Sequence, residues 1–202
     1  MEVRFHSVDS FKRLAQTGRE AGAAVSVLSA PVRAVDERAR AASFVFSDQS
    51  IDRAGDRIFA DGWRLENYRR NPVALFGHDA TALPIGKSPN VKIAGSQLLG
   101  TILFAPPELS DFAHRCFGMV KGGFLSCVSV GFRPIRWEWA KDATRPMGIN
   151  FIEQELLEIS VVPIPANARA LLLGAQLGDA EHQTKVAKRR RQIQLLRLQD
   201  GP

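Results

Sequence analysis

Three side chains of this 202-residue chain, His78, Ser129 and Glu158, have the types that could act together as base, nucleophile and orienting acid. A serine hydroxyl becomes a strong nucleophile when an adjacent base takes its proton, and the base needs a third group to fix its tautomer. Each residue also has a plain structural interpretation: a packed histidine, a serine on the wet face of a strand, and a glutamate on a hydrated face. Spacing along the chain does not show whether the three converge, because such a constellation is defined by geometry and roles.

His78 stands at the end of a short apolar run, Val73 to Phe76, within the stretch "NPVALFGHDATALPIGK". The run predicts a buried strand that would place the histidine at its C-terminal end. The Gly-Lys-Ser sequence at 86–88 invites a phosphate-loop interpretation. However, Thr81 stands where that motif requires its first glycine, so we do not expect nucleotide binding.

Ser129 belongs to "FLSCVSVGF", a run of β-branched and aromatic residues that predicts a strand over 124–132. Side chains alternate across a strand, so the residues divide into two faces. We expect the apolar face to be the core face, and Ser129 to lie on the opposite, outward face next to Gly131. The two faces consist of Phe124, Ser126, Val128, Val130 and Phe132, and of Leu125, Cys127, Ser129 and Gly131.

Glu158 lies in a second long predicted strand, in register with Ile152, Leu156, Ser160 and Val162. A carboxylate on such a largely apolar face is costly unless it is paired or hydrogen-bonded. The pattern therefore predicts either a locally hydrated face or a dedicated partner for Glu158, and an imidazole N–H is one such partner.

Metal and cofactor chemistry finds little support in the sequence. His114, Cys116 and Cys127 show neither paired-cysteine nor paired-histidine spacing, so we expect no metal site. We also expect no cofactor, and two thiols do not make a disulfide framework.

The positive charge is concentrated at the C-terminal end. The net charge is +6, of which residues 185–202 supply +5. Such a run could bind nucleic acid or an acidic membrane surface, but a solvated charge run is the plainer interpretation. No apolar stretch is long enough to predict a membrane span.

The pattern as a whole favours a mainly β protein with flanking helices. Turn residues separate six or seven predicted strands with few helices between them, which favours a mostly antiparallel sheet or barrel. We expect a loosely ordered segment over 1–24, one domain over 25–177, and a basic tail over 178–202 that is either helical or disordered. Strands are predicted near 24–35, 40–48, 73–78, 124–132 and 149–166, and a hairpin near 91–105 with its turn at or near 95–96. Helices are predicted near 61–71, 108–123 and 167–176.

Four of these stretches, in order, resemble motifs of the prohead maturation proteases of tailed bacteriophages, which are serine peptidases with a fold similar to the herpesvirus assemblins. The stretches are "DRAGDRIFADGW", "NPVALFGHDATALPIGK", "CVSVGFRPI" and "LLEISVVPIPANARA", and the resemblance covers roughly residues 25–175. It implies a small β-barrel flanked by helices. It also implies that His78 is the general base, Ser129 the nucleophile and Glu158 the third member of a triad.

The resemblance further implies where such a protein acts and on what. Members work inside the immature capsid, in the cytoplasm of the bacterial host. They cleave scaffold or the scaffold-like region of the major capsid protein, and often themselves. The expected partners are therefore the capsid and scaffold proteins, with self-association left open. Two alternatives remain: an inert capsid-assembly component of the same fold, and a nucleic-acid-binding module that acts through the basic tail.

Overall fold

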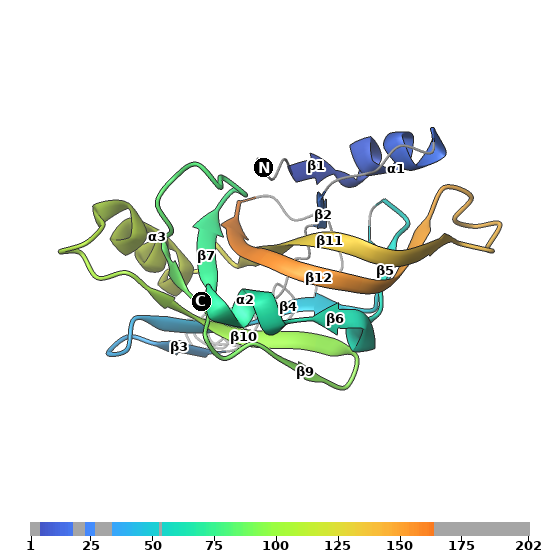
Figure 1. The fold of residues 1–202 in the computed structure, drawn as a ribbon. Helices are drawn as coiled ribbons and strands as arrows, with labels where there is room; N and C mark the ends of the chain where they lie inside the picture. Colours follow the sequence, from blue (N-terminus) through green and yellow to red (C-terminus); the bar gives the residue numbers. More distant parts are fainter. Residues whose placement is uncertain (1–4, 18–22, 27–33, 53, 164–202) are drawn as a thin grey trace, which may run out of the picture.

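The computed structural model describes residues 5–17, 23–26, 34–52 and 54–163. Helices and strands are arranged as shown in Figure 1. Their bounds are β1 (Phe5–Ser7), α1 (Val8–Gln16), β2 (Ala23–Ser26), β3 (Ala34–Asp36), β4 (Ala41–Asp48), β5 (Arg57–Ile58), the short 3₁₀ helix η1 (Ala60–Gly62), β6 (Trp63–Arg64), α2 (Glu66–Arg70), β7 (Val73–Phe76), β8 (Gly86–Lys87), β9 (Lys92–Ala94), β10 (Gln97–Phe104), α3 (Asp111–Lys121), β11 (Cys127–Trp139) and β12 (Ile149–Val162). The predicted tail over 178–202 and the helix predicted near 167–176 lie outside the described residues.

The strands form one mixed sheet that remains open. Its order is β1-β2-β11-β12-β7-β8-β10-β4-β3, with β5 and β6 added to β12 and β9 added to β10. Most pairs are antiparallel, as predicted, but β12 pairs in parallel with β5, β6 and β7. The predicted closed barrel is wrong, because within the described residues β1 and β3 form the two ends of the path and do not pair.

The sheet folds over on itself around the hydrophobic core. In Figure 1, β11 and β12 lie above β10 and β4, and β7 rises between the two layers. One core cluster joins both layers, since it contains Phe44 and Phe46 of β4, Ile102 of β10, and Val130 of β11. The turn back through β7 thus buries both layers against each other and brings the end of β7 beside β12.

Helix α3 forms close to where the sequence predicts it. Ser110 caps its start by accepting a hydrogen bond of 3.1 Å from the Ala113 N–H, and Gly122 follows its last residue. Cys116 and Phe117 pack into the core. Phe112 is half-exposed, and its ring packs edge-on against Phe76 at the end of β7.

The strand that carries Ser129 differs from the prediction at both ends. It begins at Cys127, and Phe124 is 78% exposed because it lies in the turn after α3, where its N–H donates to the Met119 carbonyl. The strand then continues to Trp139, beyond the end predicted at residue 132. Pairing along nearly the whole of β12 supports this extension. The core positions Val128, Val130 and Phe132 are confirmed.

Two other segments also differ from expectation. The helix predicted over 61–71 is confined to α2, because Trp63 and Arg64 pair with β12 instead. Residues 1–24 were expected to be loosely ordered, but the structure describes β1, α1 and the start of β2 there. Phe11 of α1 packs against the rings of Trp137 and Phe151.

Among the described residues, no helix is both long and apolar enough to cross a lipid bilayer.

Candidate active site

His78 is carried to its place by the parallel pairing of β7 with β12. Leu75 is the register partner of Ser160, and Phe76 is the register partner of Val161. After Phe76 the strand ends in two successive left-handed residues, Gly77 (φ 65°) and His78 (φ 63°). A left-handed conformation costs a non-glycine residue about 1–2 kcal/mol, so this turn needs support from its surroundings.

That support comes from Ser160 on β12. The backbone N–H of His78 donates a hydrogen bond of 3.1 Å to Ser160 Oγ, and the N–H of Gly77 donates one of 3.0 Å to the Val161 carbonyl. The chain is thus held to β12 at both left-handed residues, which fixes the direction in which the imidazole leaves the backbone.

The imidazole of His78 contacts Glu158 directly. Its Nδ1 lies 2.6 Å from Glu158 Oε1, and the Glu158 residue is only 2% exposed. An ionised carboxylate only accepts hydrogen bonds, so Nδ1 carries the proton and Nε2 is left as an acceptor. The Nε2 atom is buried and has no hydrogen-bond partner within the described part of the chain. The ring is therefore held with Nδ1 toward Glu158 and with Nε2 buried in the protein.

Ser160 supplies a second hydrogen bond to the Glu158 carboxylate. Its hydroxyl donates to Glu158 Oε2 at 2.6 Å, while its oxygen accepts the His78 N–H. Both oxygens of Glu158 are thus hydrogen-bonded, which offsets the cost of burying the charge. Sequence reasoning assigned Ser160 no role. The available signal was its period-2 spacing from Glu158, which places two polar side chains on one face of a strand.

A register shift explains how Glu158 comes to face His78. Gly131 pairs with Glu158 but Phe132 pairs with Leu156, so β12 carries one extra residue at this point. Leu156 and Ile159 therefore belong to the core, and Glu158 points to the other face. The prediction that Glu158 shares a face with Leu156 is wrong for this reason. The prediction of a dedicated imidazole partner for Glu158 agrees with the observed contact.

The two other carboxylates of this strand are engaged elsewhere. Glu155 accepts a hydrogen bond of 2.7 Å from Asn67 and pairs with Arg133. The hydrogen bond from Asn67, followed by that from Arg133, lowers the pKa of Glu155. Glu153 pairs with Arg64 at 2.8 Å. Only Glu158, of these three, contacts the histidine.

Ser129 lies on β11 directly opposite Ser160. Directly opposed residues of an antiparallel pair share a face, so Ser129 is on the same side of the sheet as Ser160 and Glu158. The predicted face is therefore correct, but the expected exposure is wrong, because Ser129 is fully buried. Since His78 Nε2 has no hydrogen-bond partner, no such bond joins it to Ser129 in this structure. The fold joins His78, Glu158 and Ser160 directly and places Ser129 on the adjoining strand.

The Gly-Lys sequence that follows the histidine has a structural explanation. Gly86 lies in β8, between β7 and β10, and a Cβ atom placed there would be 2.2 Å from the Leu103 carbonyl oxygen. Only glycine allows the two backbones to approach this closely. Gly86 thus allows β8 to pair closely with β10, and this pairing helps to position β7.

The described residues contain no cluster of three or more His, Cys, Asp or Glu side chains arranged to hold a metal ion.

Comparisons with known proteins bear directly on this site. A family model described as caudovirus prohead serine protease matches residues 46–183, which include His78, Ser129 and Glu158. The chain is 40% identical over 122 residues to the prohead protease of Escherichia phage T5. This alignment covers 58% of this chain and 54% of the T5 protein. The chain is 25% identical over 154 residues to the capsid polyprotein of Pseudomonas phage PAJU2, which covers 74% of this chain and 22% of that protein.

The chain thus spans about half the length of the T5 protein and about a fifth of the PAJU2 protein. No solved structure matches it, so the similarity to the herpesvirus assemblins stays a prediction.

Proposed function

Because this chain belongs to the caudovirus prohead serine protease family, we propose that it is a serine endopeptidase in which Ser129 is the nucleophile, His78 the base and Glu158 the orienting acid. The observation that carries this assignment is the 2.6 Å contact between Glu158 Oε1 and His78 Nδ1, which leaves a buried Nε2 free to accept a proton. Ser129 is the serine on the adjoining strand that shares a face with both Glu158 and Ser160.

The reaction is acyl transfer. Ser129 Oγ attacks the carbonyl carbon of a peptide bond as its proton passes to His78 Nε2, and the resulting imidazolium is stabilised by the Glu158 carboxylate. His78 then gives the proton to the leaving amine, so that the peptide bond breaks and an acyl-enzyme remains. Water, deprotonated by the same nitrogen, releases the second product and regenerates the hydroxyl.

In the reactive arrangement, Ser129 Oγ lies within hydrogen-bond reach of His78 Nε2. A nucleophile and its base react from about 2.6–3.2 Å, and this contact is often looser before substrate binds. Ser160 holds both the His78 backbone and Glu158, so the imidazole stays in place and Ser129 is the residue that moves.

The proposed substrates are the scaffold, or the scaffold-like region of the major capsid protein, and the chain itself. The names of the two relatives support this choice, since one is a prohead protease and the other a capsid polyprotein. The proposed place of action is the inside of the immature capsid, in the host cytoplasm. The protease domain over 25–177 and a separate basic tail remain parts of this proposal.

Co-expression with a candidate capsid protein tests the assignment. We expect truncation of the capsid protein that Ser129→Ala lowers to background, on the order of a million-fold in rate. Glu158→Gln should lower the rate about 10⁴-fold, because the amide no longer fixes the productive tautomer. Ser47→Ala is a matched control, since Ser47 is another buried serine, but lies on β4.

Three outcomes separate the alternatives. Cleavage that persists at full rate in Ser129→Ala rules out this nucleophile. A folded wild-type chain that assembles with capsid protein without cleaving it is the inert component. Binding to DNA that depends on residues 178–202, with no proteolysis, favours the nucleic-acid-binding module.

A further inference from the structure

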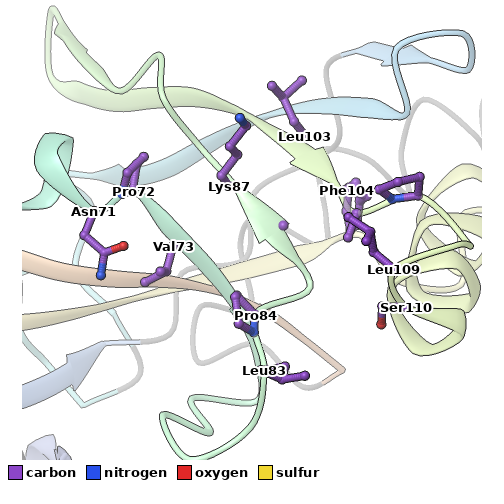
Figure 2. A pocket seen from close by; sticks show the side chains of 13 residues that line it. Asn71, Pro72, Val73, Leu83, Pro84, Lys87, Leu103, Phe104, Leu109 and Ser110 are labelled. Atoms are coloured by element: carbon purple, nitrogen blue, oxygen red, sulfur yellow. The ribbon is translucent and has the colours of Figure 1, made fainter.

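An apolar groove of about 620 Å³ lies beside the strand that leads to His78. Figure 2 shows its walls, which come from the start of β7, from β8, from the end of β10 and from the segment before α3. Leu83, Pro84, Pro106 and Leu109 supply much of the lining, and Lys87 is the one charged residue among the described residues that line it. This volume falls within the range of binding pockets for small molecules and side chains.

The rim of the groove exposes large apolar side chains to water. Leu83 is 88% exposed and Leu109 is 78% exposed. Contiguous exposed apolar surface with a concave floor is typical of interaction sites. Both leucines precede structural elements rather than lying within them, so they contribute little to the core and remain available for a partner.

Strand β7 and the connection that follows it link the groove to the candidate active site. Val73 lines it at one end of β7, and Phe76 ends the same strand two residues before His78. Phe76 in turn contacts Phe112 of α3, with ring centroids 5.3 Å apart. Leu83 belongs to the connection that starts at His78 and returns to β8. The strand and this connection therefore both lead from the groove to the imidazole.

We propose that this groove binds the polypeptide substrate, through an apolar side chain at least three residues from the scissile bond and an acidic residue next to it. The proposal rests on the proposed function. An extended chain rises about 3.3 Å per residue, so the three steps of β7 from Val73 to Phe76 span about 10 Å, or about three substrate residues, before the turn at Gly77 and His78. The apolar walls select the apolar side chain, and the Lys87 ammonium selects a neighbouring carboxylate.

The test uses binding as well as cleavage. Overlapping fluorescent peptides covering the capsid protein are titrated into the full-length Ser129→Ala protein, and binding is followed by fluorescence anisotropy. The peptide bound most tightly is then shortened from each end, and its apolar and acidic residues are replaced singly. We expect affinity to fall about tenfold or more when the apolar residue at least three positions from the cleaved bond is replaced by glycine.

Variants of the groove provide the complementary arm. Leu83→Asp and Leu109→Asp should weaken binding of the full peptide at least tenfold and raise its KM in the active protein, with kcat unchanged. Lys87→Glu should reverse the preference for an acidic residue. Ile135→Asp is the matched control, because Ile135 is a half-exposed apolar residue of β11 outside the lining. Both substituted leucines are exposed, so folding should be preserved, which circular dichroism verifies.

The results distinguish this proposal from the proposed function. If peptide binding depends on the groove residues but the wild-type chain never cleaves the peptide, the groove proposal is upheld and the protease proposal is rejected. Cleavage with peptide affinity and KM unchanged in both leucine variants rejects the groove and upholds the protease. A change of oligomeric state in those variants, without a change in peptide binding, assigns the surface to a second copy of the chain and overturns the proposal. Absence of any peptide binding also overturns it.

Discussion

Replacing Ser160 by alanine removes one hydroxyl group that serves two partners at once. The hydroxyl donates to the buried Glu158 carboxylate at 2.6 Å and accepts from the His78 N–H at 3.1 Å. Alanine fits the same space and leaves both partners in place. The variant therefore isolates the contribution of the two hydrogen bonds.

The structure sets the scale of both expected effects. A hydrogen bond to a charged group contributes about 1.5–3 kcal/mol, and the neutral bond about 1 kcal/mol. We therefore expect a loss of about 2–4 kcal/mol in the free energy of unfolding. Loss of the restraint on His78 also lets the imidazole move, and a displacement of about 1 Å costs roughly 100-fold in rate. That loss should appear in kcat and leave KM nearly unchanged.

The assay combines stability with a signature of the site itself. Urea unfolding gives the free-energy change, and cleavage of the capsid protein gives kcat and KM. Proton NMR follows the low-field signal expected from Nδ1–H in its short bond to Glu158. This signal should broaden in Ser160→Ala. Ser160→Thr keeps the hydroxyl and should recover part of kcat, which a purely structural role would not require.

Two results would refute this reasoning. A Ser160→Ala protein that keeps the wild-type kcat would show that the hydroxyl does not position the base. Equal losses in Ser160→Ala and Ser47→Ala would show that any buried serine has the same effect. Ser47 Oγ is buried and has no hydrogen-bond partner in the described part of the chain, so its removal should change the unfolding free energy very little.

Three further predictions concern the framework around the site. Gly86→Ala should lower the free energy of unfolding by about 1–3 kcal/mol in urea, since its Cβ would meet the Leu103 carbonyl oxygen at 2.2 Å; an unchanged midpoint would contradict it. Phe11→Ala should lower the unfolding free energy by about 3–5 kcal/mol and lower the thermal midpoint, because Phe11 is a buried aromatic residue; a wild-type melting curve would show that α1 adds no stability. Burial raises the pKa of Asp56 to about 6, although Lys12 lies 2.9 Å away. Protonation of Asp56 therefore stabilises the folded state; this contribution is fully present below about pH 4 and is lost as the pH rises through about 6. Urea unfolding from pH 4 to 7 should therefore show wild-type stability falling relative to Asp56→Asn by up to about 3 kcal/mol, and parallel curves would contradict this.

Local features of the fold could be read from the sequence because they depend on neighbouring residues. Ser110 and Gly122 bound α3 through hydrogen bonds within one turn of the chain. The alternation of Val128 and Val130 predicted the core face of β11, since side-chain direction in a strand has period two. The same logic failed at Phe124, where the preceding turn, and not the strand, sets the backbone direction.

At the candidate site, the residue types could be predicted from the sequence but their contacts could not. The sequence by itself determined that a histidine, a serine and a glutamate were available at the ends and faces of predicted strands, and it carried the family motifs. Only the tertiary structure decided that His78 meets Glu158, because the contact requires parallel pairing of strands about 80 residues apart. It also decided the face of Glu158, through one extra residue in β12, and the role of Ser160. Register shifts and long-range pairings arise from the packing of the whole sheet, so no local pattern specifies them.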